Sequence, residues 1–262
     1  MIDLKYISGF FPASLRDNPN YAKHMVKEYI QLMVLDYLSA TPYIKKLAFI
    51  GGTNLRLIKG IDRWSEDLDF DCRDMTKEQF MEMTDDVIGF LRRSRLNAQP
   101  KDKENPKLTA FRRNIYFPQL LFDLQLTGHK DERFLLKIEV QDQGIPYEPV
   151  MVNVKGCGFF FPLPVPPDSI LLSMKLSALL ARAKGRDFYD AMYLLSITVP
   201  DYQYLKIRAG VGNLDELKKA IAQLLSKTDL GIKKKDFEHL LFNNSNSDKI
   251  LRFADFMDSI TS

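Results

Sequence analysis

The stretch Ile50–Asp71, IGGTNLRLIKGIDRWSEDLDFD, places a glycine pair, a short helical pattern and five acidic residues close together. The apolar run KKLAFI before the glycines predicts a buried strand that stops at Gly51. The segment TNLRLIKG then predicts a helix of about two turns, with Thr53 near its start and Gly60 as its stop. Acidic and apolar residues alternate strictly in EDLDFDCR, which is the period of a strand. The stretch therefore predicts a strand, a short helix and a second strand.

The glycine pair Gly51–Gly52 at the start of the expected helix has two interpretations. Glycines let the backbone adopt unusual dihedral angles and let a ligand approach the amide groups closely. The start of a helix also offers unpaired N–H groups and a partial positive charge, both of which favour phosphate. A plain turn at the end of a strand explains the same pair.

The acidic residues Asp67, Asp69 and Asp71 lie two apart, so they point to one side of the expected strand while the apolar residues between them point to the core. Carboxylates this close repel one another unless a cation lies between them. Mg²⁺ prefers one or two carboxylates together with substrate phosphates. The solvated face of an edge strand is the alternative, but the nearby phosphate-friendly helix start favours a metal ion.

Glu139 in LLKIEVQ is the best candidate for a third carboxylate, which would complete a two-metal site. Ile138 and Val140 are expected to face the core, so Glu139 faces the opposite side. Asp123 in LLFDLQL is the rival candidate, and an ordinary half-exposed strand also explains Glu139. Whether the strand of Glu139 neighbours the acidic strand is left open by the sequence.

The remaining chain predicts an α+β fold. Helices are expected over Asn20–Ala40 and Thr76–Leu96, and two further strands within residues 111–128 and 133–144. The segment GCGFFFPLPVPPDS holds four prolines and two glycines, so it is expected to lie outside regular elements, with a domain boundary near Pro167. A mixed α/β domain, residues 1–166, is thus expected before a helical domain, residues 167–262. The helical segments of the second domain are DSILLSMKLSALLARAKG, RDFYDAMYLLSITV, NLDELKKAIAQLLSK and KDFEHLLFN.

Three cations in the helical half, Lys175, Arg182 and Arg186, are spaced to share one helical face if the helix runs on. Gly185 interrupts the pattern, so a first helix is expected to end near Lys184. Lys175 lies among leucines, and a lysine in an apolar setting needs an anionic partner. A nucleoside triphosphate would supply that partner. Asp187 or Asp190 would supply it equally well in a purely structural ion-pair network.

Composition narrows the class of protein. The 262 residues are 45% hydrophobic, enough for a packed core, and the formal net charge of +3 does not demand a nucleic-acid partner. Two cysteines are too few for a disulfide framework. The first residues, MIDLKYISGFF, are not expected to form a signal peptide because no basic region precedes an apolar run, and no apolar run is long enough to cross a membrane. A cytoplasmic protein is therefore expected. The three histidines have no metal-ligand spacing among them.

The combination of GGT at Gly51–Thr53, RWSEDLDFD, KIEV and Lys175…Arg182…RDFYD resembles the AbiEii/AbiGii-type nucleotidyltransferase toxin family. That family belongs to the DNA-polymerase-β-like nucleotidyltransferase superfamily, and the resemblance runs from about Tyr21 to Leu195. It implies a nucleotidyltransferase domain with a mixed sheet flanked by helices, then a helical domain, with the nucleotide held between them.

The resemblance also implies roles for individual residues and partners. The residues that would hold the triphosphate are Gly51, Gly52 and Thr53. Asp67 and Asp69 would bind Mg²⁺ or Mn²⁺, Lys175 would bind phosphate, and Asp187 would act as base or orienting group. The residues that complete the C-terminal motif are Arg182, Arg186 and Asp190. Family members resemble toxins of type IV toxin–antitoxin or phage-abortive systems, which implies a separately encoded antitoxin, and some transfer nucleotides onto tRNA.

Other acceptors stay open at this point. A small hydroxylated molecule or a protein side chain is one alternative, and a nucleotide-binding module without turnover is another. Clustered basic residues favour RNA, because phosphate contacts need Lys and Arg, although a solvated surface explains them too. They are Arg92, Arg93, Arg95, Lys101, Lys103, Arg112 and Arg113. Asp71 and the residues after about Val199 receive no role.

Overall fold

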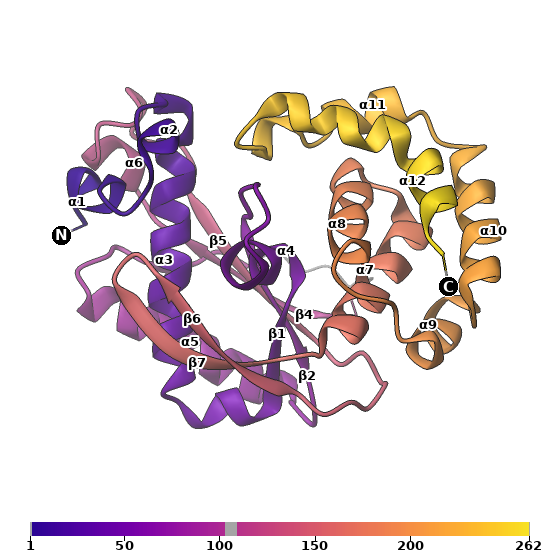
Figure 1. The fold of residues 1–262 in the computed structure, drawn as a ribbon. Coiled ribbons are helices and arrows are strands. Elements are labelled where there is room, and N and C mark those ends of the chain that lie inside the picture. Colours follow the sequence, from indigo (N-terminus) through magenta and orange to yellow (C-terminus); the bar gives the residue numbers. More distant parts are fainter. Residues whose placement is uncertain (1, 103–108, 262) are drawn as a thin grey trace. The chain divides into compact units, whose positions relative to one another are not determined.

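A computed structural model describes residues 2–102 and 109–261 of the chain. The chain divides into two compact units (Figure 1). The first unit comprises Met1–Gly60, Trp64–Gly144 and Pro149–Val165. The second comprises Ile61–Arg63, Ile145–Glu148 and Pro166–Ser262. A three-residue piece of the quoted stretch, Ile61–Arg63, therefore belongs to the second unit although the residues on either side of it belong to the first.

A mixed five-stranded sheet organises the first unit, with the strand order β1-β2-β5-β4-β3. Strand β2 runs parallel to β5, while the other three pairs are antiparallel. Leu68 and Phe70 of β2 are buried, as the alternating sequence predicts. The strands are β1 (Leu47–Ile50), β2 (Asp67–Cys72), β3 (Gln99–Pro100), β4 (Phe111–Tyr116) and β5 (Leu135–Gln141).

Two long helices, α3 (Ala22–Ser39) and α5 (Lys77–Arg93), lie on the same side of this sheet in Figure 1. Both predicted helices are thus confirmed, and Thr76 caps the N-terminus of α5 by forming a capping box with Gln79. The shorter helical elements are α1 (Leu4–Ser8), α2 (Ala13–Arg16), η1 (Pro19–Tyr21), η2 (Pro42–Lys46), α4 (Gly51–Asn54), η3 (Leu55–Lys59) and α6 (Leu120–Asp123).

The proline-rich segment is not irregular, so that prediction is wrong. It forms the second strand of an antiparallel hairpin, β6 (Val150–Gly156) and β7 (Phe159–Val165), joined by Cys157 and Gly158 with positive φ angles. Pro162 and Pro164 lie within β7. Alternate residues of a strand turn their nitrogen atoms to the same side, so two prolines spaced two apart can both face the unpaired edge of a two-stranded sheet.

The strand expected within residues 111–128 ends earlier than the apolar pattern suggests. Strand β4 ends at Tyr116, and Gln119 adopts a left-handed conformation before α6 begins. Asp123 therefore ends a short helix instead of lying on a strand. This removes the structural basis on which Asp123 competed with Glu139 as a metal ligand.

The second unit is mostly helical. Helix α7 ends at Arg182 and α8 begins at Gly185, close to the predicted break. A Cβ atom at Gly185 would lie 1.9 Å from the carbonyl oxygen of Lys233, so only glycine lets these segments approach. The segment KDFEHLLFN forms only a 3-10 turn, shorter than the expected helix. The elements are α7 (Asp168–Arg182), α8 (Gly185–Leu195), α9 (Tyr202–Ala209), α10 (Leu214–Leu225), α11 (Leu230–Lys235), η4 (Glu238–Leu240), η5 (Asn244–Arg252) and α12 (Phe253–Ser259).

Within residues 2–102 and 109–261, no helix is long and apolar enough to cross a membrane.

Candidate active site

Gly51 brings the start of the short helical segment directly against the acidic strand. Ile50, the last residue of β1, lies opposite Asp69 in the register of β1 and β2. Gly51 has a φ angle of +82°, and a Cβ atom on it would lie only 2.3 Å from Asp69 Oδ2. Glycine is thus required twice at this position, for its dihedral angle and for the absence of a side chain. The first N–H groups of α4 consequently lie beside a carboxylate predicted to bind metal.

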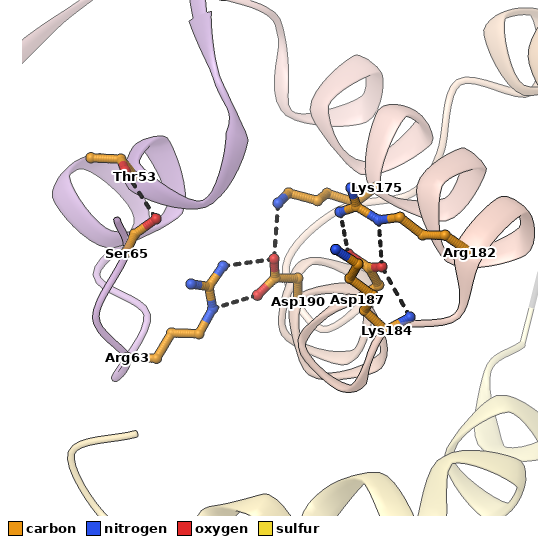
Figure 2. Close-up of polar contacts among 8 residues, drawn as sticks. All are labelled: Thr53, Arg63, Ser65, Lys175, Arg182, Lys184, Asp187 and Asp190. Carbon is orange, nitrogen blue, oxygen red and sulfur yellow. Dashed lines mark hydrogen bonds and ion pairs between the residues drawn. The ribbon is translucent and has the colours of Figure 1, made fainter. Parts of the chain in front are cut away.

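Thr53 is fully buried, and its hydroxyl group has partners inside the protein (Figure 2). The Oγ1 atom lies 2.9 Å from Ser65 Oγ and also donates to the main-chain oxygen of Asp67. These bonds connect α4 to the first residue of β2 and so fix where the acidic strand begins. The hydroxyl of Thr53 therefore holds the acidic strand β2, while phosphate contact by this residue stays a prediction for its backbone N–H.

The acidic strand and β5 are neighbours, which the sequence left open. In their parallel register Asp67 lies opposite Lys137, and Asp69 lies opposite Glu139. Lys137 Nζ is 2.8 Å from Asp67 Oδ2 and 3.4 Å from Glu139 Oε2. Burial disfavours the ammonium charge, but the adjacent Asp67, Glu139 and Asp69 carboxylates outweigh it and raise the pKa of Lys137. The structure thus brings the three predicted carboxylates to one face of the sheet and adds a lysine among them.

Asp71 has a different environment from the other two acids of β2. It is buried, with 5% of its surface exposed, and its Oδ1 accepts a hydrogen bond of 2.9 Å from the main-chain N–H of Gln143. This bond fastens the chain just after β5 to the end of β2. Asp71 therefore has a structural role in the sheet, which answers the question that the sequence left open about this acid.

The donor set on this face suits a hard divalent cation. Asp67 and Asp69 are on alternate positions of one strand and supply carboxylate oxygens, and one or two such groups plus substrate phosphates are what Mg²⁺ takes. Within the part of the chain that the structure describes, no group of three or more His, Cys, Asp or Glu side chains is arranged to hold a metal ion. Glu139 Oε2 accepts from Arg112 at 2.8 Å and contacts Lys137, so its place as a third ligand stays a prediction.

In the second unit, Lys175 belongs to a buried cluster around Asp190 (Figure 2). Arg63 donates two hydrogen bonds to the Asp190 carboxylate, at 2.7 and 2.8 Å, and Lys175 Nζ donates a third at 2.9 Å. Burial alone would raise the pKa of Asp190, but the two cations outweigh it and lower that pKa to about 2. Two cations share one carboxylate, so the cluster carries one net positive charge.

Arg63 is the residue of this cluster that the sequence did not assign. It is 1% exposed and lies in RWSEDLDFD, the same motif that carries the acids predicted to bind metal. An arginine immediately before a buried tryptophan and an acidic strand gives no periodic signal. Only its partner Asp190, 127 positions later in the chain, makes its role visible.

Asp187 is also fully buried and is held by a different arginine (Figure 2). Arg182 donates to both carboxylate oxygens at 2.7 and 2.8 Å, and the main-chain N–H of Lys184 donates at 3.2 Å. The residue after Arg182, Ala183, has a φ angle of +47° and ends α7. Arg186 therefore does not continue the face of Lys175 and Arg182, because the helix does not run on. The proposed base role of Asp187 and the phosphate contacts of both arginines stay predictions.

Two of the basic residues that favoured RNA are engaged inside the first unit. Arg112 pairs with Glu139, and Arg113 is only 4% exposed and pairs with Asp85 and Asp102. They contribute no free surface charge. Lys103 lies outside the described residues. The basic residues that remain exposed are Arg92, Arg93, Arg95 and Lys101.

The chain matches one protein family and resembles several solved structures. The family model described as nucleotidyl transferase AbiEii toxin, type IV TA system, matches residues 33–261. The solved structure of MenT4, a nucleotidyltransferase toxin from Mycobacterium tuberculosis H37Rv, is similar with a TM-score of 0.61 at 16% identity, over 100% of this chain and 91% of that chain. JHP933 from Helicobacter pylori is similar with a TM-score of 0.54 at 19% identity, over 90% of each chain. No curated protein matches the chain. The structural likeness confirms the α+β fold.

Proposed function

The chain belongs to the AbiEii nucleotidyltransferase toxin family of type IV toxin–antitoxin systems, and on that premise we propose that it transfers a nucleoside monophosphate to a hydroxyl group of RNA, such as tRNA. The family match confirms the resemblance read from the sequence and makes the protein a nucleotidyltransferase, whose donor substrate is a nucleoside triphosphate. The metal ion, the acceptor and the residue roles are what the proposal adds.

The close approach of Gly51 to Asp69 is the observation that carries the proposal. It puts unpaired helix N–H groups, which favour phosphate, next to a carboxylate that favours a divalent cation. A nucleoside triphosphate with its metal ion is the ligand that needs both at once. A plain turn between strands would not need a glycine packed against a carboxylate.

In this proposal Asp67 and Asp69 hold Mg²⁺ or Mn²⁺, and the backbone of Gly51 and Gly52 binds the triphosphate. When bound, the ion neutralises phosphate charge and favours ionisation of the acceptor hydroxyl. The acceptor hydroxyl gives up its proton to solvent, and its oxygen bonds to the α-phosphorus as the bond from that phosphorus to pyrophosphate breaks. The net positive charge shared by Arg63, Lys175 and Asp190 suits an anion, which supports Lys175 as a phosphate ligand.

RNA is the favoured acceptor because exposed cations cluster along one part of the chain. Arg92 and Arg93 are the last residues of α5, Arg95 lies in the turn after it, and Lys101 follows β3. Such residues contact phosphates without reading sequence. We place the reaction in the cytoplasm, where RNA and nucleoside triphosphates occur together, and we expect a separately encoded antitoxin to counteract it.

The test is incubation of the full chain with each α-labelled nucleoside triphosphate, total RNA and Mg²⁺, followed by separation of the products. We expect a labelled RNA band with at least one nucleotide. Asp67→Asn is expected to lower the rate at least about 100-fold, because a lost metal ligand removes several kcal/mol of charge stabilisation.

Asp74→Asn is the matched control, since Asp74 is exposed and follows the same strand. Far-UV circular dichroism checks that both variants fold. Label in a protein band or a small molecule would move the acceptor to those classes. Undiminished transfer by Asp67→Asn would remove the metal assignment, and no label in any acceptor would contradict the proposal.

A further inference from the structure

The acidic face of β2 and β5 carries its own fixed cations. Lys137 lies directly opposite Asp67 in the parallel register, and its ammonium group contacts both Asp67 and Glu139. Arg112 lies opposite Glu139 on the other neighbouring strand, β4, and donates to the same Oε2 atom, from Nε at 2.9 Å and from Nη2 at 2.8 Å. Each cation is therefore placed by strand register as well as by its ion pair.

The net charge of this face is therefore less negative than its three carboxylates alone would make it. Asp67, Asp69 and Glu139 contribute three negative charges, and Lys137 and Arg112 contribute two positive charges. These five side chains taken together carry one net negative charge. Fixed cations repel a second divalent ion, whereas one divalent ion needs only Asp67 and Asp69 together with substrate phosphates.

One carboxylate oxygen of Glu139 is already engaged, which disfavours Glu139 as a ligand of a second ion. Its Oε2 atom already accepts from the guanidinium of Arg112, and the carboxylate is only 23% exposed. A pair of metal ions about 3.5–4 Å apart needs a carboxylate oxygen that is available to them. The Lys137 ammonium contacts both Asp67 and Glu139, so a fixed cation already bridges these two carboxylates.

We infer that the Lys137 ammonium takes the place of the second metal ion, so that this transferase binds one divalent cation per active site. The inference rests on the proposed function, because it concerns the metal ion of that reaction. Lys137 acts here by filling a cation position, and Glu139 acts by holding Lys137 and Arg112. The alternative is that Lys137 merely braces two strands and that Glu139 turns to a second ion when nucleotide binds.

The experiment counts Mn²⁺ ions bound to the full chain by electron paramagnetic resonance, with and without a non-hydrolysable ATP analogue. One Mn²⁺ per chain is expected in both conditions. Two ions in the presence of nucleotide would overturn the inference and support Glu139 as a ligand. No bound ion at all would contradict the metal assignment of the proposed function as well, and the labelled-nucleotide assay reads that function separately.

The Mn²⁺ affinity of Lys137 variants gives a second test, because a lysine that only joins the two strands would not weaken metal binding through its charge. Lys137→Met removes a positive charge beside the ion, so Mn²⁺ should bind about tenfold more tightly, or a second ion should appear. Unchanged or weaker binding would overturn the inference, because a lost brace loosens the site. Lys137→Arg should keep a single ion. Lys155→Met is the matched control, since Lys155 is exposed on β6, and it should bind like the original chain.

Discussion

Replacing Arg63 by methionine should destabilise the helical unit by about 3 kcal/mol or more. Arg63 and Asp190 are 1% and 0% exposed, so the change leaves a buried carboxylate with Lys175 as its remaining cation. Removing one partner of a buried ion pair costs about 3–5 kcal/mol, and the bond of 2.9 Å from Lys175 keeps the value at the lower end. The lowering of the pKa of Asp190 from 3.8 to about 2 gives the same scale, about 2 kcal/mol of stabilisation at neutral pH.

Urea unfolding of the full chain can resolve this effect when two probes are compared. The fluorescence of the single tryptophan, Trp64, follows the first unit, whereas circular dichroism follows the helices of both units, so a loss confined to the second unit shifts the second signal more than the first. We expect Arg63→Met to lower the midpoint of the circular-dichroism transition at 222 nm. The matched control is Lys234→Met, which removes a more exposed ion pair with Asp248 in the same unit and should leave the midpoint unchanged.

A loss of less than about 1 kcal/mol in Arg63→Met, the size of a surface pair, would refute the reasoning. It would mean that Asp190 is satisfied by Lys175 alone. A double variant that also carries Asp190→Asn should cost less than the sum of the two single changes, since the first change already removes the interaction.

Two further predictions concern the site glycine and acidic pH. Gly51→Ala should lower the free energy of unfolding by about 1–3 kcal/mol because of its positive φ angle, and it should lower the transfer rate about 100-fold because its Cβ displaces the Asp69 carboxylate. The control is Gly60→Ala, which has a φ angle of +76° and nothing within 4 Å of its Cβ, and which should lose stability but keep its transfer rate. Equal transfer rates in the two variants would contradict the role of Gly51. Because the folded-state pKa of Asp190 lies below its unfolded value of 3.8, its stabilisation is fully present above about pH 4 and is lost as the pH falls through about 2. Urea unfolding across that range should show a gap of about 2 kcal/mol between the original chain and Asp190→Asn that closes on acidification, and a constant gap would argue against this origin.

The local features of the first unit follow from the sequence. Alternation in EDLDFDCR correctly places Leu68 and Phe70 in the core and Asp67 and Asp69 on the opposite face. The glycine pair correctly marks the end of β1 and the start of a helical segment. These predictions succeed because periodicity reports which side of a segment is buried, and that depends only on residues close together in the chain.

Tertiary structure alone decides which segments meet. The pairing of β2 with β5 sets Lys137 against Asp67, and it also puts Glu139 beside Asp69. Ile61–Arg63 belongs to the second unit, where Arg63 pairs with Asp190. The proline-rich segment forms strand β7, although its sequence predicts an irregular segment. Each of these outcomes depends on contacts between residues far apart in the chain. Such contacts form where the two surfaces pack well and satisfy each other's charges and hydrogen bonds. The pattern of apolar and polar residues along the chain does not identify the distant segment that a residue will contact. It therefore predicts which face of a helix or strand the residue occupies, but not its neighbours in the fold.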